Sequence, residues 1–376
     1  MEKRILLAFD LTRETGQDMQ RAAVRAIRAQ KLWRVDSCLP GAANIRRALK
    51  GNPPPAGVIA HVSSHAMARA LEPLETPIIN VSDILDRSPF QRVCADGYAA
   101  GRELANYLCD KGIGKVLYFA GSTHHYSKRR LAGLSSVLGH RNPCTLSVAT
   151  AGQADRTWFG EHLQNHLETD LPFAAILDGG QMARQFYGAA NHLGLSVPHD
   201  VAVVDFNAEP TYCESVHPML SCVGMPSTAI GRRAACELVR RIDGESEPEH
   251  EIRLPPPGIQ ERASSSVVAT RDPRLRAALA AIAETQGDIT VNELLRIANA
   301  SRRPLEHLFR SQVGRSPHDM IRHARLRRAK SLLANTDMNI TTIAAECRFS
   351  TSSHLGSVFR RHFGCTPSAW RERSRR

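Results

Sequence analysis

Two similar segments lie 50 residues apart near the carboxyl end of this chain. HLFRSQVGRSP ends at Pro317 and SVFRRHFGCTP ends at Pro367, and at the same offset Gly314 aligns with Gly364. A match at one fixed offset usually marks a repeated structural unit, because the same local sequence favours the same local structure. The repeat therefore predicts two copies of one small unit near the end of the chain.

The positive charge of the chain is concentrated in the same region. The 376 residues carry a formal net charge of +12. Residues 271–376 contain 20 Lys and Arg but only 9 Asp and Glu, whereas residues 1–270 contain 29 and 28. A basic block attracts phosphate groups and releases their counterions, so nucleic acid is the first candidate partner. A charged surface that only keeps the protein in solution is the alternative interpretation.

The basic region begins with a helical pattern from Arg271 to about Thr285. Further on, Thr290 and Glu293 have the spacing of a capping box, which marks the start of a helix. Ser301 then begins a second short helix, whose apolar residues recur at helical spacing. Two short helices joined by a tight turn predict a helix-turn-helix unit.

A long helix is predicted after this first unit. Gly314 ends the preceding helix, and Ser316 and Pro317 open the long one, because proline is favoured in a first helical turn. After Asn335 the same cycle of short helix, turn and second helix repeats. We therefore expect two helix-turn-helix units joined by a rigid connector. Two reading helices can enter successive major grooves of DNA when they lie about 34 Å apart.

Two motifs in the basic region are specific. RLRRAKSLL lies in the long helix, and the pattern F-R-R-x-F-G-x-T-P-x-x-W-R spans residues 359–371. With them, residues 272–372 resemble the AraC/XylS family of DNA-binding domains. The family usually has glycine before an aromatic residue in the second turn, where this chain has Arg348 before Phe349. Glycine permits a positive φ there, so we expect Arg348 either to tolerate that conformation with some strain or to change the turn.

This resemblance places the DNA contacts on the outward faces of the two reading helices. Arginine can hold guanine with two hydrogen bonds, and glutamate can accept one from cytosine. Arginines further along each helix suit phosphate contacts instead. The predicted base contacts are Arg302, Arg303, Glu306 and His307 in the first unit and Ser352, Ser353, His354 and Ser357 in the second, and the predicted phosphate contacts are Arg310, Arg360 and Arg361. For any one of them, a solvated helix face is the alternative interpretation.

Residues 1–255 alternate short apolar runs with helical stretches. The runs are continuous, which indicates strands covered on both faces and hence a parallel α/β sheet. They are RILLAF, AGVIAHV, PIINV, KVLYFAG, FAAILD and VAVVDF. In such sheets ligands bind beyond the carboxyl ends of the strands. Polar residues at those ends form a candidate rim for a ligand site, although loops are polar in any case: Asp10, Arg13, His61, Asp178 and Asn207.

No catalytic or phosphate-binding motif stands out in this part of the chain. The sequence lacks G-x-x-x-x-G-K-[ST], G-x-G-x-x-G and G-x-S-x-G patterns. His124 and His125 are adjacent, and adjacent side chains on a regular element point apart, so we expect no metal. We likewise expect no enzymatic activity and no cofactor.

The cysteines and the hydropathy pattern bear on the compartment. Nine scattered cysteines without a C-x-x-C pair fit reduced thiols, and hence a cytoplasmic protein. A membrane-spanning helix needs about 18 or more consecutive apolar residues, and the sequence has no such run. We therefore expect no partner in the membrane.

Three segments of the neutral region carry a second resemblance. ADGYAAGRELANYLCDKGIGKVLYFAG, then RRLAG, and then GLSVPHDVAVVDFN are similar to the ligand-binding domain of LacI-type repressors and periplasmic sugar-binding proteins. The resemblance implies two α/β lobes that close around a sugar, with Asp96, Arg130, Trp158 and Asn207 lining the cleft. A carboxylate and an arginine can chelate neighbouring hydroxyls, while an aromatic face packs on the sugar ring.

Two departures from this family concern the proposed sugar contacts. Asn207 stands where the family has an aspartate, which keeps hydrogen bonding but removes a charge. Asp178, Gly179 and Gly180 replace the usual asparagine and aspartate before the next helix. One ligand contact is therefore expected to be moved or missing, and the preferred sugar to differ from that of related proteins.

These features together predict the domain organisation. We expect a two-lobed α/β sensor with parallel sheets, resembling periplasmic binding proteins, followed by an all-α domain with two helix-turn-helix units. The expected boundaries are residues 1–255 for the sensor, 256–271 for an exposed linker rich in Pro and Ser, and 272–376 for the DNA-binding domain.

The function implied by both resemblances is transcription regulation controlled by a small sugar, with xylose or a related pentose as the first candidate. The expected partners are a double-stranded DNA operator, the sugar, a second copy of the chain in a homodimer and, for an activator, RNA polymerase. Activation is expected rather than repression. Two alternatives stay open: a constitutive DNA-binding regulator that has lost ligand sensing, and an enzyme domain fused to a DNA-binding tail.

Overall fold

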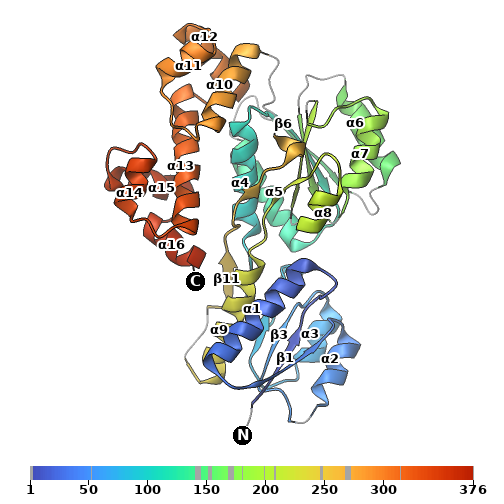
Figure 1. The fold of residues 1–376 in the computed structure, drawn as a ribbon. Helices are drawn as coiled ribbons and strands as arrows, with labels where there is room; N and C mark the ends of the chain where they lie inside the picture. Colours follow the sequence, from blue (N-terminus) through green and yellow to red (C-terminus); the bar gives the residue numbers. More distant parts are fainter. Residues whose placement is uncertain are drawn as a thin grey trace.

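The computed structural model arranges the chain as two α/β lobes followed by a helical domain (Figure 1). We call residues 3–266 the two-lobed domain and residues 272–375 the helical domain. The structure describes residues 3–51, 53–139, 145–150, 155–167, 173–179, 181–198, 200–206, 209–245, 249–266, 272–313 and 315–375. Gly314, which was predicted to end a helix, and residue Asn207 lie outside these ranges.

The first lobe is built on a parallel sheet with the strand order β11-β5-β4-β3-β1-β2. Side chains of β1 alternate between the two faces, and helices cover both: Ile5 and Leu7 face α1 and α9, and Leu6 and Ala8 face α2 and α3. Burial on both faces explains why this strand is a continuous apolar run. The bounds are β1 (Arg4–Ala8), β2 (Arg34–Cys38), β3 (Gly57–Ala60), β4 (Ile78–Asn80), β5 (Gln91–Ala95), β11 (Glu251–Leu254), α1 (Glu14–Gln30), α2 (Ala42–Leu49), α3 (His65–Leu71) and α9 (Ser227–Ile242).

The second lobe repeats this plan with the strand order β12-β10-β9-β8-β6-β7, in which only the β10–β12 pair is antiparallel among the described strands. Helices α4 and α5 cover one face, and α6, α7 and α8 pack on the other. The bounds are β6 (Lys115–Ala120), β7 (Thr145–Thr150), β8 (Phe173–Asp178), β9 (Val201–Phe206), β10 (Ser221–Val223), β12 (Ile259–Gln260), α4 (Gly97–Asp110), α5 (His125–Leu138), α6 (Arg156–Leu167), α7 (Ala183–His192) and α8 (Pro210–Ser215).

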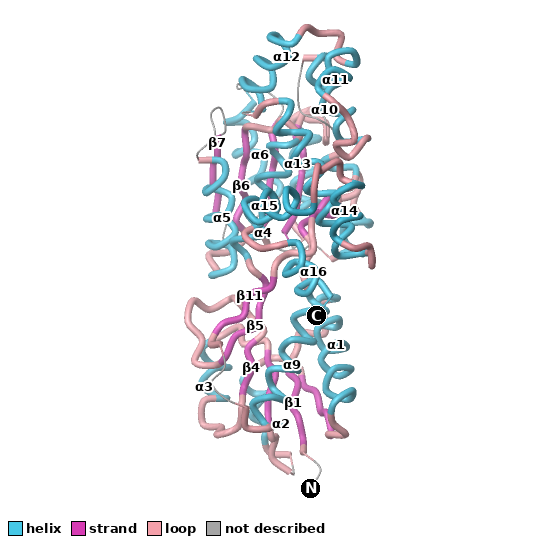
Figure 2. The backbone as a smooth tube through the Cα atoms, turned by 90° about the vertical axis from the view of Figure 1, so that its left-hand side faces the viewer, coloured by secondary structure: helices cyan, strands magenta, loops and turns pink. Residues whose placement is uncertain are grey.

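The chain passes between the lobes at three places, and each lobe is therefore discontinuous in sequence. The crossings lie between β5 and α4, between β10 and α9, and between β11 and β12. Figure 2 shows β11 and β5 next to the junction of the lobes. Two packed bodies whose only covalent connections are such short segments are the arrangement in which hinge closure occurs around a ligand.

The helical domain contains the two predicted helix-turn-helix units. The first consists of α11 (Val291–Ile297) and α12 (Arg302–Leu308), the second of α14 (Ile340–Glu346) and α15 (Ser352–Phe363). The predicted capping box of Thr290 and Glu293 is confirmed at the start of α11. Ser316 caps the long connector, as the Ser-Pro pair indicated. The other bounds are α10 (Pro273–Glu284), a π turn at Phe309–Val313, α13 (Pro317–Asn335) and α16 (Pro367–Arg375).

The connector α13 belongs to the apolar cores of both units. Met320 and Ile321 near its start pack with the first unit, and Leu326 and Ala329 further on pack with the second. Because one continuous helix contributes to both cores, the two units cannot turn independently without breaking one of them. The predicted long connecting helix is confirmed, and its rigidity stays a prediction.

Two expectations need correction. The predicted strands are confirmed as β1, β3, β4, β6, β8 and β9, but β2, β5, β7, β10, β11 and β12 were not recognised. Most of these are short or expose polar residues, so they lack the continuous apolar signal. The expected exposed linker at 256–271 is wrong for the part that includes β12, Ser264 and Ser265: β12 pairs with β10, and both serines are completely buried in the second lobe. Within the described residues, no helix is both long and apolar enough to cross a membrane.

Candidate functional site

The first lobe contributes three of the predicted rim residues, at the ends of β1 and β3. Asp10 accepts hydrogen bonds from the backbone N–H (3.1 Å) and the hydroxyl (2.5 Å) of Thr12. Arg13 is exposed at the N-cap position of α1. His61 donates its backbone N–H to Ala8. Burial lowers the pKa of His61, the carboxylate of Asp10 opposes this shift, and Arg13 adds to it, so the three side chains share one environment.

The second lobe holds Arg130 in a buried network at the end of β8. Asp178 is completely buried and accepts hydrogen bonds from the hydroxyls of Tyr118 and Ser127 and from the guanidinium of Arg130. The guanidinium also lies 4.8 Å from the centre of the Phe206 ring. Burial disfavours the charge of Arg130, but the attraction of Asp178 outweighs it and raises the pKa of Arg130. Asp178 thus orients Arg130, and its own contact with a ligand stays a prediction.

The remaining predicted ligand contacts are more dispersed. Asp96 caps the start of α4 and lies 3.6 Å from Arg129. Trp158 lies on α6, on the face of the sheet opposite α5, with its ring centre 5.5 Å from that of Phe119. Asn207 lies outside the described residues. The structure therefore places the three first-lobe residues in one environment and holds Arg130 through Asp178. No contact joins Trp158 to the first-lobe residues or to Arg130 among the described contacts.

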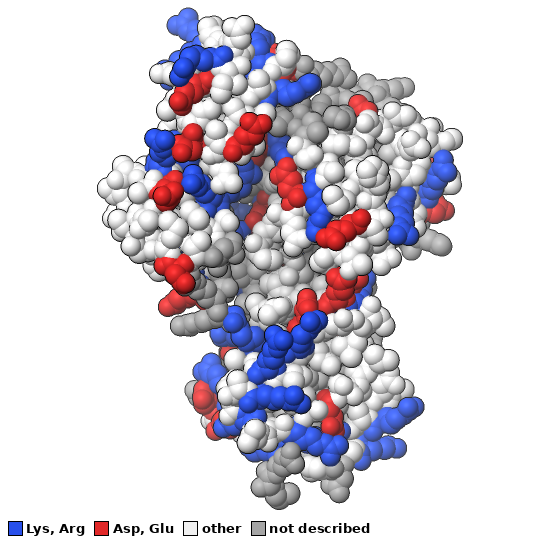
Figure 3. Space-filling model, in the orientation of Figure 1, with Lys and Arg blue, Asp and Glu red and all other residues white. Residues whose placement is uncertain are grey.

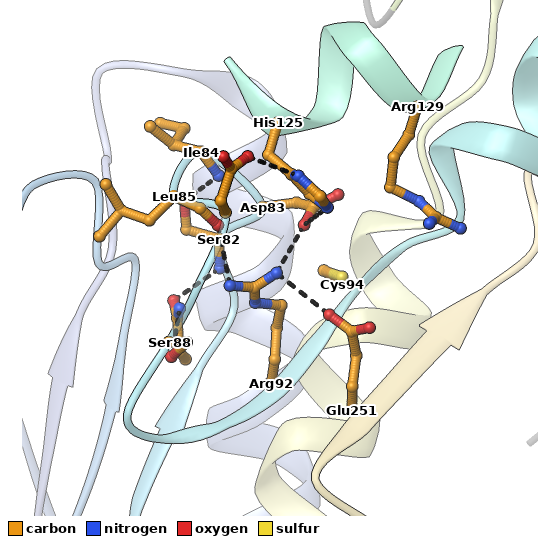
Figure 4. Close-up of polar contacts among 12 residues, drawn as sticks. Ser82, Asp83, Ile84, Leu85, Ser88, Arg92, Cys94, His125, Arg129 and Glu251 are labelled. Carbon is orange, nitrogen blue, oxygen red and sulfur yellow. Dashed lines mark hydrogen bonds and ion pairs between the residues drawn. The ribbon is translucent and has the colours of Figure 1, made fainter. Parts of the chain in front are cut away.

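One set of contacts joins the two lobes through the loop after β4 (Figure 4). The backbone N–H groups of His125 and Tyr126, at the start of α5, donate to the carbonyls of Ile84 and Asp83. The His125 ring lies 2.7 Å from the carboxylate of Asp86. The hydrogen bond with His125 lowers the pKa of Asp86, so this carboxylate is ionised at neutral pH. The amino end of the Arg130 helix is thus tied to the first lobe.

An ion network lies directly beneath this junction. Asp83 accepts from Arg92 and Arg253, each at 2.9 Å, and Glu251 accepts from Arg92 at 3.0 Å. Asp83, Cys94 and Glu251 offer atoms within 4.8 Å of one another, the spacing of metal ligands. Burial raises the pKa of Cys94 to about 12, so its thiol stays protonated. Two guanidinium groups already neutralise the carboxylates, so the cluster suits an internal ion network better than a metal.

A second contact between the lobes lies at the start of α1. The backbone N–H of Glu14 donates to the carboxylate of Glu209 in the second lobe (3.2 Å). The hydroxyl of Thr211 donates to the carboxylate of Glu14. A carboxylate at a helix amino end is favoured, because the free N–H groups there carry partial positive charge. Sequence reasoning missed this contact, because nothing in the sequence links residues almost 200 positions apart.

Asp205 on β9 is a buried carboxyl group that the sequence analysis does not include among the candidate site residues. Its side chain is completely buried, and neither oxygen has a partner among the described residues. Burial raises the pKa of Asp205 well above its usual range, and the nearby charge of Asp178 adds to the shift. Both effects favour the neutral form of this carboxyl group. The signal in the sequence is an acid inside the apolar run VAVVDF, a run that by itself predicts only a strand.

A hollow of about 470 Å³ lies away from these groups, on the outer face of the first lobe. It lies between α1 and α9, and its lining includes Arg21, Arg25 and Arg232. Figure 3 shows Lys and Arg side chains gathered over this face. None of the rim residues lines the hollow, so it is separate from the predicted ligand site.

The predicted base-contacting side chains lie on the outer faces of both reading helices. In the first unit, Arg303 and His307 are exposed, and Arg302 pairs with Glu306 at 3.0 Å. In the second, Ser353, His354 and Ser357 are exposed and Ser352 is half-buried. The predicted phosphate contacts Arg310, Arg360 and Arg361 are exposed as well. Their DNA contacts stay predictions, but each side chain except that of Ser352 is open to solvent or engaged only at the surface.

The two turns that precede the reading helices share one unusual conformation. Asn299 in the first turn has φ 45° and Arg348 in the second has φ 57°. Arg348 therefore adopts the conformation in which the family prefers glycine. Its side chain pairs with Asp288 at 2.7 Å, and its carbonyl accepts a hydrogen bond from Arg325. Arg348 is thus held in the left-handed conformation, and these contacts offset part of its strain.

Two α/β lobes joined by three crossings, followed by two helix-turn-helix units, define a class of protein. The chain is a DNA-binding transcription regulator with a ligand-binding domain of the periplasmic binding protein type. Residues 294–373 match the helix-turn-helix domain family, and residues 105–265 match the periplasmic binding protein-like domain family.

Some similar proteins align with most of the chain. The chain is 26% identical over 331 residues to the xylose operon regulatory protein of Escherichia coli (strain K12), covering 84% of this chain and 83% of that protein. Its fold matches the structure of the xylose-binding transcription activator xylR with a TM-score of 0.61 and 22% identity, over 99% of this chain and 98% of the other. The two-lobed domain also matches a LacI-family regulatory protein from Chloroflexus aggregans, with a TM-score of 0.59 and 19% identity over 70% of this chain and 98% of the other.

Proposed function

We propose that the two-lobed domain binds a small sugar, with D-xylose as the first candidate, and that this binding controls how the helical domain engages an operator. The observation that carries the proposal is the buried support of Arg130. Asp178, which accepts from the hydroxyls of Tyr118 and Ser127, holds one guanidinium in a fixed orientation near the end of the sheet, where α/β domains bind their ligands. A fixed guanidinium can donate to neighbouring hydroxyls of a sugar at small entropic cost.

The first lobe supplies a complementary group of side chains. Asp10, Arg13 and His61 lie in one environment at the carboxyl ends of β1 and β3. Burial keeps His61 neutral at pH 7, so its ring can both donate to and accept from hydroxyl groups. We infer that a sugar bridges this trio and Arg130, with Asp96, Trp158, Asp178 and Asn207 as further candidates. The contacts through His125 and Glu209 stabilise the lobe arrangement in which such bridging occurs.

The proposal for the pentose rests on likeness alone. The relatives at 26% identity are named for xylose, and similar solved regulators are described with bound ribose or D-xylulofuranose. A sugar panel is therefore the appropriate probe. We further propose that the protein acts in the cytoplasm as a homodimer on two operator half-sites, and that it activates transcription through contact with RNA polymerase.

The direct test measures sugar binding by the full-length protein. Thermal melting is recorded with D-xylose, D-ribose, D-xylulose and L-arabinose, and titration calorimetry then measures the affinity of any sugar that raises the Tm. We expect at least one pentose to raise the Tm, because a ligand that binds only the folded state stabilises it. Replacing His61 with Ala should weaken that binding. Arg130→Lys should weaken it too, while keeping a positive charge beside Asp178.

The operator is defined by letting the protein select duplexes from a random-sequence pool. We expect the selected sequences to contain two related half-sites and their affinity to change at least fivefold with the sugar. Sugar-independent affinity together with an unchanged Tm across the panel would favour a constitutive regulator instead. If NMR detects conversion of any sugar by the protein, the alternative of an enzyme domain would be favoured.

A further inference from the structure

An acidic face of α4 in the second lobe meets a basic face of the helical domain. Asp110, the last residue of α4, pairs with Arg315 and, at 3.0 Å, with Arg327. One and two turns earlier on the same face, Asn106 accepts a hydrogen bond from Arg315 (2.9 Å) and Glu103 pairs with a lysine of α13 (2.6 Å). Figure 1 shows α4 and α13 side by side, and Figure 3 shows both signs of charge where the helical domain meets the second lobe.

These charges are largely removed from water. The side chains of Asp110, Arg315 and Lys330 retain 2%, 6% and 9% of their exposure. The ammonium of Lys330, the partner of Glu103, also lies 4.6 Å from the centre of the Trp370 ring. Breaking a buried pair by removing one partner costs far more than breaking a surface pair, because the other charge stays buried. The contact therefore holds the two domains in one defined arrangement.

The last turn of the second reading helix lies close to the charges of this interface. His362 on α15 lies edge-on to His323 of α13, with ring centres 4.4 Å apart. Burial lowers the pKa of His362 to about 4, against the attraction of Asp110, and the nearby Arg315 lowers it further. His362 is therefore neutral at physiological pH and adds no charge to the arginines and lysine already at the interface.

Helix α4 is also locked to the helix that carries Arg130. Gly101 of α4 and Gly133 of α5 let the two backbones touch: a methyl group on Gly101 would collide with the carbonyl oxygen of Arg130, and one on Gly133 with that of Tyr98. Packing this close leaves no room for α5 to slide or rotate independently of α4. A displacement of Arg130 therefore moves α4, including Asp110 at its far end, as part of one body.

We propose that α4 and α5 form a rigid link from the ligand site to the helical domain, and that Asp110 is the positioning residue through which this link sets the orientation of the two reading helices. The inference rests on the proposed function, since it concerns how a bound sugar reaches the DNA-binding surface. Asp110 touches neither the sugar nor the DNA. It acts by holding Arg315 at the start of the connector and Arg327 within it, so that the position of α4 dictates that of α13.

The test measures the effect of sugar on DNA binding in matched variants of the full-length protein. The readout is the ratio of operator Kd values with and without saturating D-xylose, or whichever pentose raises the Tm. The variants are Asp110→Asn and Glu103→Gln, which keep the shape of each side chain and remove its charge. The matched control is Glu346→Gln, which removes an ion pair with Arg328 within the helical domain, away from α4.

We expect the unmodified protein and Glu346→Gln to show a ratio of at least five. In Asp110→Asn the ratio should fall to within about twofold of one, and in Glu103→Gln it should fall part of the way. Sugar affinity measured by calorimetry should stay within about threefold in all variants, because the change affects coupling and not the ligand contacts. Glu103 is a quarter exposed, so its variant remains informative if Asp110→Asn does not fold.

The outcomes separate the two proposals. If the unmodified protein binds a pentose and responds on DNA, but both interface variants keep its full ratio, the rigid link is wrong and sugar sensing stands. If no pentose binds the unmodified protein or changes its operator affinity, the proposed function fails and the link fails with it. If Asp110→Asn lost sugar affinity as strongly as it lost the Kd ratio, the rigid-link proposal would also be wrong. Asp110 would then help to hold the ligand-binding residues in place.

Discussion

The two helix-turn-helix units share a backbone plan but differ in the chemistry of their reading helices. Both turns place one residue in the left-handed conformation, Asn299 in the first unit and Arg348 in the second. The first reading helix presents two arginines, a glutamate and a histidine, whereas the second presents mainly serines and one histidine. The first helix also ends in a π turn, whereas α15 runs twelve residues to Gly364 at φ 77°.

This difference indicates a division of labour between the units. Long side chains with two donors can discriminate one base pair from another, whereas short hydroxyls reach base edges only at very close approach. The reading helix of the second unit also ends near the two-lobed domain, where the charge of Asp110 acts on His362. We infer that the first unit supplies most of the sequence preference, and that the second supplies position and receives the influence of the ligand.

The largest expected effect concerns the cores of the two units. Phe309 and Phe359 are aligned in the repeat and completely buried. Replacing either with Ala should lower the free energy of unfolding of the helical domain by about 3–5 kcal/mol, because a cavity replaces a packed ring. Hydrogen exchange should show loss of protection in the mutated unit and in α13. Protection lost in the mutated unit alone would contradict the shared role of the connector.

The next effect separates the reading helices. Arg303→Ala should cost about 1–3 kcal/mol of binding free energy and remove the preference at one operator position. Ser353→Ala, at an exposed position early in the second reading helix, should cost less than about 1 kcal/mol. Binding to a panel of single-base operator variants measures both. A uniform loss across the panel for Arg303→Ala would show that this residue contacts phosphate, and the division of labour would then fail.

A smaller and sequence-independent effect is expected from the aligned pair Arg310 and Arg360. Replacing either with Ala should weaken binding to all duplexes alike and reduce the slope of log Kd against log salt by about one, since one phosphate contact is lost. Titrations at several salt concentrations test this. If the two variants lose the same affinity and the same salt slope, the two units make equivalent phosphate contacts and differ only in their base contacts. A change in base preference would argue against phosphate contacts.

The smallest effect concerns the turns. Arg348→Gly should relieve the strain of a non-glycine residue at φ 57° and raise the free energy of unfolding by up to about 1 kcal/mol. The gain is limited because the substitution also removes the surface pair with Asp288. Asn299→Gly is the matched change in the first unit, and it should have less effect because asparagine tolerates this conformation. Chemical unfolding of both variants makes the comparison, and destabilisation of Arg348→Gly would mean that the side-chain contacts outweigh the strain.

Much of the fold could be predicted because its signals are local. The capping box at Thr290, the proline in the first turn of α13 and the continuous apolar run of β1 each report a structure formed by neighbouring residues. The polar strand β2 at a sheet edge and the two-residue strand β12 carry no such signal. They exist because a partner strand supplies hydrogen bonds from elsewhere in the chain.

The candidate site likewise has residues that the sequence predicts and contacts that only the folded structure shows. The position of Asp10 after a strand and of Arg130 in the RRLAG motif could be read from the sequence. The buried support of Arg130 by Tyr118 and Asp178 could not, because three segments meet only when the sheet and α5 are assembled. The sequence shows an acid at Asp205 inside an apolar run. That its side chain is buried without a hydrogen-bond partner among the described residues depends on packing that no local pattern reveals.

The sequence by itself determined that this chain ends in two copies of a basic helical unit and begins with an α/β domain of parallel strands. Periodicity, caps and charge are properties of short stretches, so they can be recognised without knowledge of the rest of the chain. Only the tertiary structure decided that Asp110 meets Arg315, more than 200 residues away, and that Gly101 brings α4 against the backbone of Arg130. Such contacts arise from how whole elements pack, and the pairing of two charges distant in sequence is set by that packing alone.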